Sequence, residues 1–450
     1  MSFYCAELPY RSDASAYFAA IAGLPWAAWL DSGGMARYDI LAAAPQRSIV
    51  LDGNAACADP FALLREELGP PVAPVPDIPF AGGALGYWSY DLARRMMQLP
   101  ELAQDGERLP DMAVGLYDWA LVLDHELHTA KLVSHRRYAE TEALLPELLR
   151  RLQSVAPLPR DDFRVCGSIA SNFTPASYRV AFDAVQDYLQ AGDCYQINLA
   201  QRFSAAASGD AFGAYFELRR ISPAPYSAFL NLPQAQILCA SPERFLSVRG
   251  GRAETRPIKG TRPRGRDAAE DARLVQELHA NPKDRAENLM IVDLLRNDLG
   301  KSCLPGSVRV PELFAVESYA NVHHLVSTVE GELAPGRDAL DLLRDCFPGG
   351  SVTGAPKQRA MQIIEQLEPQ RRGVYCGAIG YIGFDGNMDT NIAIRTLVHS
   401  AGQIRCWAGG GIVADSQCAA EYQETLDKAS AMLELLRHYG GEHDYTTQSE

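Results

Sequence analysis

An acidic residue lies on an otherwise apolar helical face in the second half of the chain. The segment 284–299, DRAENLMIVDLLRNDL, contains no proline or glycine, and its spacing predicts a helix. On that helix Glu287 shares one face with Ile291 and Leu294. A carboxylate on a face that packs inward is a candidate for chemistry.

A second group of charged side chains recurs at helical spacing near the C-terminus. A helix over 419–436 would place Glu421, Glu424 and Lys428 on one face. If this face meets Glu287, the oxygens suit a hard divalent ion such as Mg²⁺, because Mg²⁺ needs few protein carboxylates and completes its coordination with water and substrate oxygens. Two solvated faces with salt bridges between neighbouring turns would give the same pattern.

A lysine lies among arginines in the segment 254–266, ETRPIKGTRPRGR. Its cationic neighbours are Arg256, Arg262, Arg264 and Arg266. Because nearby cations disfavour the charged form of an amine, this crowding would lower the pKa of Lys259 and free the amine as a nucleophile or base. A basic surface loop with two prolines is the alternative interpretation.

Two further features could bind an anion. Residues 389–398 alternate like a strand, which would put Asn391 and Arg395 on one face, where the arginine could hold a carboxylate through two hydrogen bonds. Downstream, three consecutive glycines at 409–411 offer bare backbone N–H groups that can hold an anion, although a packed glycine corner is equally consistent.

A mixture of helices and paired strands must position these residues. Thr174 followed by Pro175 is typical of a helix start, and apolar residues recur at helical spacing until the helix ends at Ala191-Gly192. The predicted strands cover 226–232, 237–240, 376–383 and 387–398, the last two joined as a hairpin through Asp385-Gly386. Hairpins mixed with long helices predict an α+β fold with large antiparallel sheets.

The composition narrows the classes of function. The chain has 450 residues, 42 basic and 56 acidic, and the net charge of −14 argues against nucleic-acid and membrane-surface binding. We expect a cytoplasmic protein, because the first residues do not resemble a secretory signal and no run is long enough to span a membrane. Ten cysteines without any CxxC pair fit a reduced cytosolic enzyme better than disulfides or a zinc site.

Taken together, ordered segments over nearly the whole chain resemble the chorismate-utilising enzymes, which include anthranilate, isochorismate and salicylate synthases. They are GDCYQINLAQRF (192–203), SPERF (241–245), PIKGTRPRG (257–265), AENLMIVDLLRNDLG (286–300), VHHLVS (322–327), PGGSVTGAPK (348–357), AIRT (393–396), AGGGIVADS (408–416) and EYQETLDKA (421–429). Anthranilate synthases have a similar segment, PIAGT, with alanine at the position of Lys259. A lysine there is typical of the members that aminate chorismate at C4 on the way to 4-aminobenzoate and folate.

The resemblance implies a covalent mechanism. Lys259 would attack C2 of chorismate while the C4 hydroxyl leaves, and ammonia would then enter at C4 and displace the lysine. Glu243, in SPERF, would act as general acid and later as base. The product would be 4-amino-4-deoxychorismate. Two alternatives are an anthranilate synthase component I and a non-catalytic tryptophan-sensing scaffold that kept the fold.

The resemblance also implies the groups that bind substrate and metal. Mg²⁺ would be held by Glu287 and Glu424, with support from Glu421 and Lys428. The other substrate contacts would come from Arg395 and Tyr375 on the enolpyruvyl carboxylate, the backbone of Gly409 and Gly411, and contact or orienting roles for His324, Ser351 and Thr353. Gln196 occupies the position at which members that hydrate chorismate have a lysine, so hydration is disfavoured.

The N-terminal part resembles the regulatory lobe of anthranilate synthases. LDSGG (30–34) and SPAPYSAFL (222–230) resemble the segments of a tryptophan pocket, whose ligand would contact Ser32, Pro225 and Tyr226. Simple packing between lobes would explain the same residues.

The implied architecture has two lobes whose antiparallel sheets pack as a sandwich with helices outside. The N-terminal lobe would cover 1–155 and the chorismate-binding catalytic domain 170–437. The sequence contains no glutaminase signature, so ammonia would arrive free or from a separate glutamine amidotransferase subunit, component II.

Overall fold

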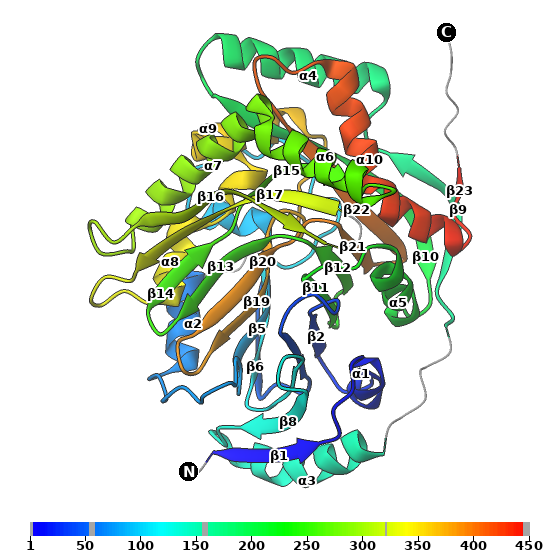
Figure 1. The fold of residues 1–450 in the computed structure, drawn as a ribbon. Coiled ribbons are helices and arrows are strands. Elements are labelled where there is room, and N and C mark those ends of the chain that lie inside the picture. The colour runs from blue at the N-terminus through cyan, green and yellow to red at the C-terminus, as the bar shows by residue number, and fades with distance from the viewer. Residues whose placement is uncertain (1–2, 54–58, 155–160, 320–321, 444–450) are drawn as a thin grey trace.

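The computed structural model describes residues 3–53, 59–154, 161–319 and 322–443, which form two large β-sheets with helices outside them (Figure 1). The predicted α+β sandwich is therefore confirmed. The predicted lobe boundary at residue 155 lies outside the described residues.

The first sheet has 13 strands and contains both early and late parts of the chain. Its order is β1 (Tyr4–Leu8), β8 (Thr129–Ser134), β7 (Ala120–Asp124), β3 (Tyr38–Ala42), β2 (Ala27–Asp31), β11 (Tyr226–Asn231), β12 (Gln236–Ser241), β21 (Thr396–Ser400), β22 (Gln403–Ile412), β10 (Gln196–Ser208), β9 (Arg164–Ser171) and β23 (Glu442–His443), with β18 (Gly354–Ala355) paired to β10. The early strands join the later ones through the antiparallel pair β2–β11, in which Asp31 lies opposite Ser227.

The second sheet has 10 strands and is likewise shared. Its order is β15 (Ile258–Pro263), β17 (Val322–Glu332), β14 (Arg252–Thr255), β13 (Arg244–Arg249), β20 (Met388–Ile392), β19 (Ala378–Gly383), β5 (Gly83–Trp88), β6 (Met112–Tyr117) and β4 (Arg47–Leu51), with β16 (Arg309–Ser318) paired to β17. The predicted hairpin between β19 and β20 is confirmed, and Gly386 takes the positive φ of 80° that its turn requires.

Helices cover the outer faces of the sheets (Figure 1). Apolar residues of α1 (Ser15–Ile21), α3 (Ala139–Gln153), α5 (Phe212–Ile221) and α10 (Cys418–His438) form one cluster with the first sheet, and α4 (Pro175–Gln190) and α9 (Lys357–Leu367) form a smaller one. The largest cluster joins the two sheets with α2 (Pro60–Leu68), α7 (Pro282–Gly300) and α8 (Ala339–Cys346), and α6 (Ala268–Ala280) lies beside β15–β17. The largest cluster is the core of the sandwich.

The helices that carry the predicted chemistry begin and end close to their expected positions. In α4 the side chain of Thr174 accepts a hydrogen bond from the backbone N–H of Ser177. The side chain of Ser177 accepts one from the backbone N–H of Thr174, which completes a capping box. Helix α7 begins with Asn281 as its cap and Pro282 in the first turn, so its acidic face has a fixed start.

One predicted strand is wrong. Residues 389–398 do not form a single strand, because β20 ends at Ile392 in the second sheet and β21 begins at Thr396 in the first. Arg395 lies in the crossing with a positive φ of 49°, which interrupts the alternation of side chains. Asn391 and Arg395 therefore face two different cavities.

The described residues form neither a helix able to cross a membrane nor a disulfide. Within those ranges no helix combines the length and apolar character needed to cross a membrane. All nine cysteines that the structure describes are free of disulfides.

Candidate active site

A cavity of about 480 Å³ lies where the two sheets meet helices α7 and α10. Most of the predicted site residues line it: Lys259, Glu243, Arg395, Tyr375, Gly409, Gly411, His324, Ser351, Lys428, Glu287, Glu424 and Glu421. These residues come from distant parts of the chain, so the fold assembles them into one place.

Lys259 lies on β15, where its Nζ donates a hydrogen bond to the carbonyl oxygen of Ser351 at 3.1 Å. Burial, reinforced by Lys428, lowers the pKa of Lys259, while Glu287 and Glu243 oppose the shift. The lysine is thus a candidate nucleophile, because a larger share of its amine is neutral near pH 7 than in water.

The predicted cause of this shift is wrong. The four neighbouring arginines are held by carboxylates: Arg256 by Glu317, Arg262 by Glu277 and Asp284, Arg264 by Asp271 and Arg266 by Glu270. Because these ion pairs neutralise the arginines, removal of the amine from water is the main cause, and crowding by the arginines is not.

Glu243 lies between β12 and β13 and is buried. Its Oε1 accepts a hydrogen bond from Ser351 Oγ at 2.8 Å, so one serine touches both candidate catalytic groups. Burial raises the pKa of Glu243, which helps the carboxyl group to keep a proton that it can donate.

The acidic faces of α7 and α10 both line this cavity. The alternative interpretation, in which both faces are fully solvated, is therefore excluded. Glu424 pairs with Lys428 at 2.6 Å, and Lys428 lowers the pKa of Glu424 against the effect of burial. Burial raises the pKa of Glu287 and of Glu421. Oε2 of Glu421 is buried and has no hydrogen-bond partner in the described part of the chain.

These carboxylates fit a divalent cation that takes few protein ligands. Within the described ranges no three His, Cys, Asp or Glu side chains are arranged as a metal-binding group, so a cage of three carboxylates is not preformed. The unpartnered oxygen of Glu421 and the neighbouring Glu424 still offer hard oxygen donors of the kind that Mg²⁺ combines with water and substrate oxygens. A Cβ at Gly410 would stand 3.0 Å from Glu421 Oε2 and 3.3 Å from Glu424 Oε1, so a larger residue there would crowd both carboxylates.

The three glycines form neither a corner nor a turn, because they lie within β22 and pair with β10. The N–H groups of Asn198 and Ala200 point away from β22, toward Thr353 O at 2.8 Å and Glu368 Oε1 at 2.9 Å. Bonding directions alternate along an antiparallel pair, so Gly409 and Gly411 direct their backbone polar groups away from β10 and into the cavity edge. Lys428 Nζ already donates to Gly409 O at 3.0 Å.

A cation and two aromatic rings form a further part of the cavity wall. No carboxylate among the described residues pairs with Arg395, and burial lowers the pKa of its guanidinium. Tyr375 stacks on Trp407 with ring centroids 6.0 Å apart and planes 7° from parallel. An unpaired, water-poor guanidinium is suited to an anionic ligand.

His324 contributes a neutral ring to this wall. Its Nδ1 is 2.9 Å from Thr261 Oγ1, and burial, with Arg395 nearby, lowers its pKa to about 4. The imidazole is therefore uncharged at neutral pH and can orient a ligand without adding charge.

Two predicted residues do not line the cavity. The amide of Gln196 is fully buried beneath Gly411 and has no hydrogen-bond partner within the described residues. Thr353 turns its hydroxyl back to Gly349 O at 3.1 Å, while its own carbonyl accepts from the N–H of Asn198. Both residues contact segments that line the cavity, Gln196 at Gly411 and Thr353 at Asn198.

Sequence reasoning missed several lining residues, including Asn198 and Trp407. Oδ1 of Asn198 is buried without a hydrogen-bond partner in the described ranges. Asn198 follows the predicted Gln196 by two residues on β10, and Trp407 precedes the predicted Gly409 by two residues on β22. The period of two along a strand could therefore have identified both.

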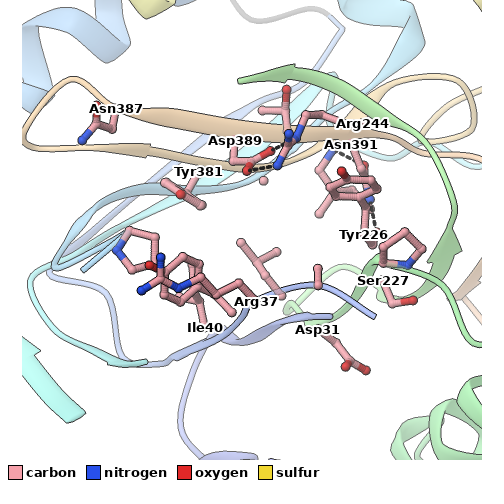
Figure 2. A pocket seen from close by; sticks show the side chains of 18 of the residues that line it. Asp31, Arg37, Ile40, Tyr226, Ser227, Arg244, Tyr381, Asn387, Asp389 and Asn391 are labelled. Carbon is pink, nitrogen blue, oxygen red and sulfur yellow. Dashed lines mark hydrogen bonds and ion pairs between the residues drawn. The ribbon is translucent and has the colours of Figure 1, made fainter. Parts of the chain in front are cut away.

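A second cavity of about 480 Å³ lies between the sheets and is shown in Figure 2. Of the three residues predicted to contact tryptophan, Pro225 and Tyr226 line this cavity, whereas the buried Ser32 does not. Arg244 bridges to Asp389 at 3.1 Å and lies over the Tyr226 ring, 5.1 Å from its centre. Asn391, on the same wall, donates to the carbonyl oxygen of Tyr226 at 2.8 Å. Arg244 directly follows Glu243, so neighbouring residues line the two cavities.

Comparisons with known proteins identify the family of the chain. The model of a family described as chorismate binding enzyme matches residues 27–434. Aminodeoxychorismate synthase component 1 of Escherichia coli strain K12 is 49% identical over 448 residues, which cover 95% of this chain and 97% of that protein. Anthranilate synthase component 1 of Streptomyces coelicolor is 42% identical over 425 residues, covering 90% and 82%.

A solved structure supports the same assignment. The crystal structure of anthranilate synthase component I from Streptococcus pneumoniae TIGR4 superposes with a TM-score of 0.79 at 35% identity, and covers 88% of this chain and 92% of that one. With a matching family model over most of its length and relatives of this identity and coverage, the chain belongs to the family of chorismate-binding enzymes.

Proposed function

We propose that the protein is component I of an aminodeoxychorismate synthase, which converts chorismate and ammonia to 4-amino-4-deoxychorismate for 4-aminobenzoate and folate synthesis. The observation that carries the proposal is Lys259, an amine with a lowered pKa that shares Ser351 with a buried acid, Glu243. The similarity to relatives named aminodeoxychorismate synthase component 1 supports it. An anthranilate synthase would not need this amine, and a non-catalytic scaffold would need neither Lys259 nor Glu243.

Substrate binding follows from the distribution of charge. Arg395 takes the enolpyruvyl carboxylate, with Tyr375 and the backbone of Gly409 and Gly411 beside it. Glu287 and Glu424, with Glu421 alongside, would hold Mg²⁺, which when bound supplies positive charge for the ring carboxylate. His324 remains neutral and orients the substrate.

The chemistry then proceeds in two displacements. The neutral amine of Lys259 forms a bond to C2, the ring double bonds shift, and the C4–O bond breaks as Glu243 donates a proton to the C4 hydroxyl, which leaves as water. Glu243 takes the excess proton from the new C–N centre. Ammonia next forms a bond to C4, the double bonds shift back, and the bond between C2 and Lys259 breaks, while Glu243 shuttles the proton from the entering nitrogen to the amine.

Ammonia is supplied by a glutamine amidotransferase partner, component II. The name component 1 carried by the relatives supports a two-component enzyme, and the chain has no glutaminase signature of its own. The free cysteines support work in the reducing cytoplasm.

The first prediction concerns the product and its nucleophile. Purified protein with chorismate, Mg²⁺ and an ammonium salt should yield a product that keeps the enolpyruvyl group and exchanges hydroxyl for amine, detected by mass spectrometry without release of pyruvate.

Lys259→Ala should lower the rate by about a thousandfold or more. Because the neutral amine is the reactive form, kcat should rise with pH through a midpoint below the ordinary lysine value.

Arg264→Ala is the matched control for this prediction. Its side chain lies on the same basic segment but pairs with Asp271 at 2.8 Å, outside the cavity. It should leave the pH midpoint unchanged. Anthranilate with equimolar pyruvate would instead identify an anthranilate synthase, and no turnover even with a partner glutaminase would favour the scaffold.

The second prediction concerns the metal. Glu287→Gln and Glu424→Gln should each raise the Mg²⁺ concentration for half-maximal activity by about tenfold or more, because each removes a charged oxygen ligand. They should also reduce the increase in melting temperature that Mg²⁺ causes. Asp293→Asn on the exposed side of α7 should change neither quantity. Equal Mg²⁺ dependence in all three variants would disprove this metal site.

The third prediction concerns the second cavity, which we propose binds tryptophan. Its cationic, acidic and aromatic walls suit a zwitterionic aromatic amino acid (Figure 2). Tryptophan should raise the melting temperature of the protein, and Tyr226→Ala should abolish that shift. Glu287→Gln should keep the shift, because it alters only the catalytic cavity. No shift in the wild-type protein, and no tryptophan by mass spectrometry after denaturation, would leave packing as the role of these residues.

A further inference from the structure

Behind the catalytic cavity, a buried ion pair connects the segments that form its walls. Glu368 follows α9, Arg372 lies four residues later, and they are 4% and 1% exposed. Arg372 Nε donates to Glu368 Oε2 at 3.0 Å, and Nη2 donates to Oε1 at 2.6 Å. Neither residue lines the cavity.

The first segment held by the pair carries the contacts to both catalytic groups. Arg372 Nη1 donates to the carbonyl oxygen of Val352 at 2.8 Å. The preceding residue, Ser351, accepts from Lys259 and donates to Glu243. A shift at Val352 would therefore move the serine that orders nucleophile and acid.

The second segment is the wall formed by β10. Arg372 Nη2 donates to Asn198 O at 2.7 Å, and Glu368 Oε1 accepts from the N–H of Ala200 at 2.9 Å. The guanidinium also lies 5.7 Å from the centre of the Tyr375 ring. One ion pair thus contacts three walls of the cavity.

We propose that Glu368 and Arg372 are positioning residues that set the distance between the Ser351 segment, β10 and Tyr375 for the amination of chorismate. The inference rests on the proposed function. Displacements of about 1 Å at a reacting centre can lower rates by about a hundredfold, so the chemical step should be sensitive to this pair. Among the described residues neither Arg395 nor α10 forms a hydrogen bond or ion pair with Glu368 or Arg372, so binding of the substrate carboxylates should be less sensitive.

The same helix offers a matched control. Glu365, in the last turn of α9, is 7% exposed and pairs with Arg94. Its Oε1 accepts from the N–H groups of Leu102 at 2.9 Å and Ala103 at 3.0 Å. Among the described residues it contacts no wall of the cavity, so Glu365→Gln breaks a similar buried pair without releasing those walls.

The experiment compares Glu368→Gln with Glu365→Gln. In Glu368→Gln, kcat should fall by about tenfold or more while KM for chorismate changes less than about twofold. Hydrogen exchange measured by mass spectrometry should accelerate at 196–200 and 350–355. Glu365→Gln should resemble the wild type in both measurements. If Glu368→Gln does not fold, Arg372→Lys, which keeps the charge but cannot reach both carbonyl oxygens, takes its place.

The outcomes separate this inference from the proposed function. An active wild type with equal kcat and equal exchange in both variants would overturn the positioning role. A wild type that does not aminate chorismate would overturn the proposed function, and the exchange comparison would still decide whether the pair holds the two segments.

Discussion

Exclusion of water from the cavity around Lys259 is the constraint on which the site depends. Burial disfavours charge on an amine and on a carboxyl group alike, so it lowers the pKa of Lys259 and raises that of Glu243. A single physical cause therefore favours the neutral form of both the nucleophile and the acid. The arginines nearby do not disturb this balance, because each of them is paired with a carboxylate.

The architecture supplies this environment because neither sheet encloses the cavity alone. The chain leaves the second sheet after β20 and enters the first at β21, and Arg395 lies in that crossing. Its positive φ costs about 1 kcal/mol, which the surrounding structure must offset. In return, a guanidinium without a carboxylate partner among the described residues lines the catalytic cavity.

Much of the fold and the site could be predicted from the sequence. Capping residues and helical spacing identified α4, α7 and α10, and the family resemblance identified about half of the residues that line the cavity, including most of the charged ones. These signals are local, and a period of 3.6 or 2 reports on one element at a time.

The errors arose where the outcome depends on distant parts of the chain. Asn391 and Arg395 alternate correctly, but the chain changes sheet between them. The arginines near Lys259 look crowded in sequence, although partners such as Glu317 neutralise them in space. The contact between Trp407 and Tyr375 could not be predicted, because only the assembled fold brings the two rings together.

The adjacency of Glu243 and Arg244 has a consequence for how the two cavities can diverge. One residue faces the catalytic cavity and the next faces the cavity between the sheets. Glu243 lies between β12 and β13, and Arg244 begins β13, so a backbone shift at this junction would move a wall of each cavity at once. Divergence of either cavity is thereby constrained by the backbone that the other one needs.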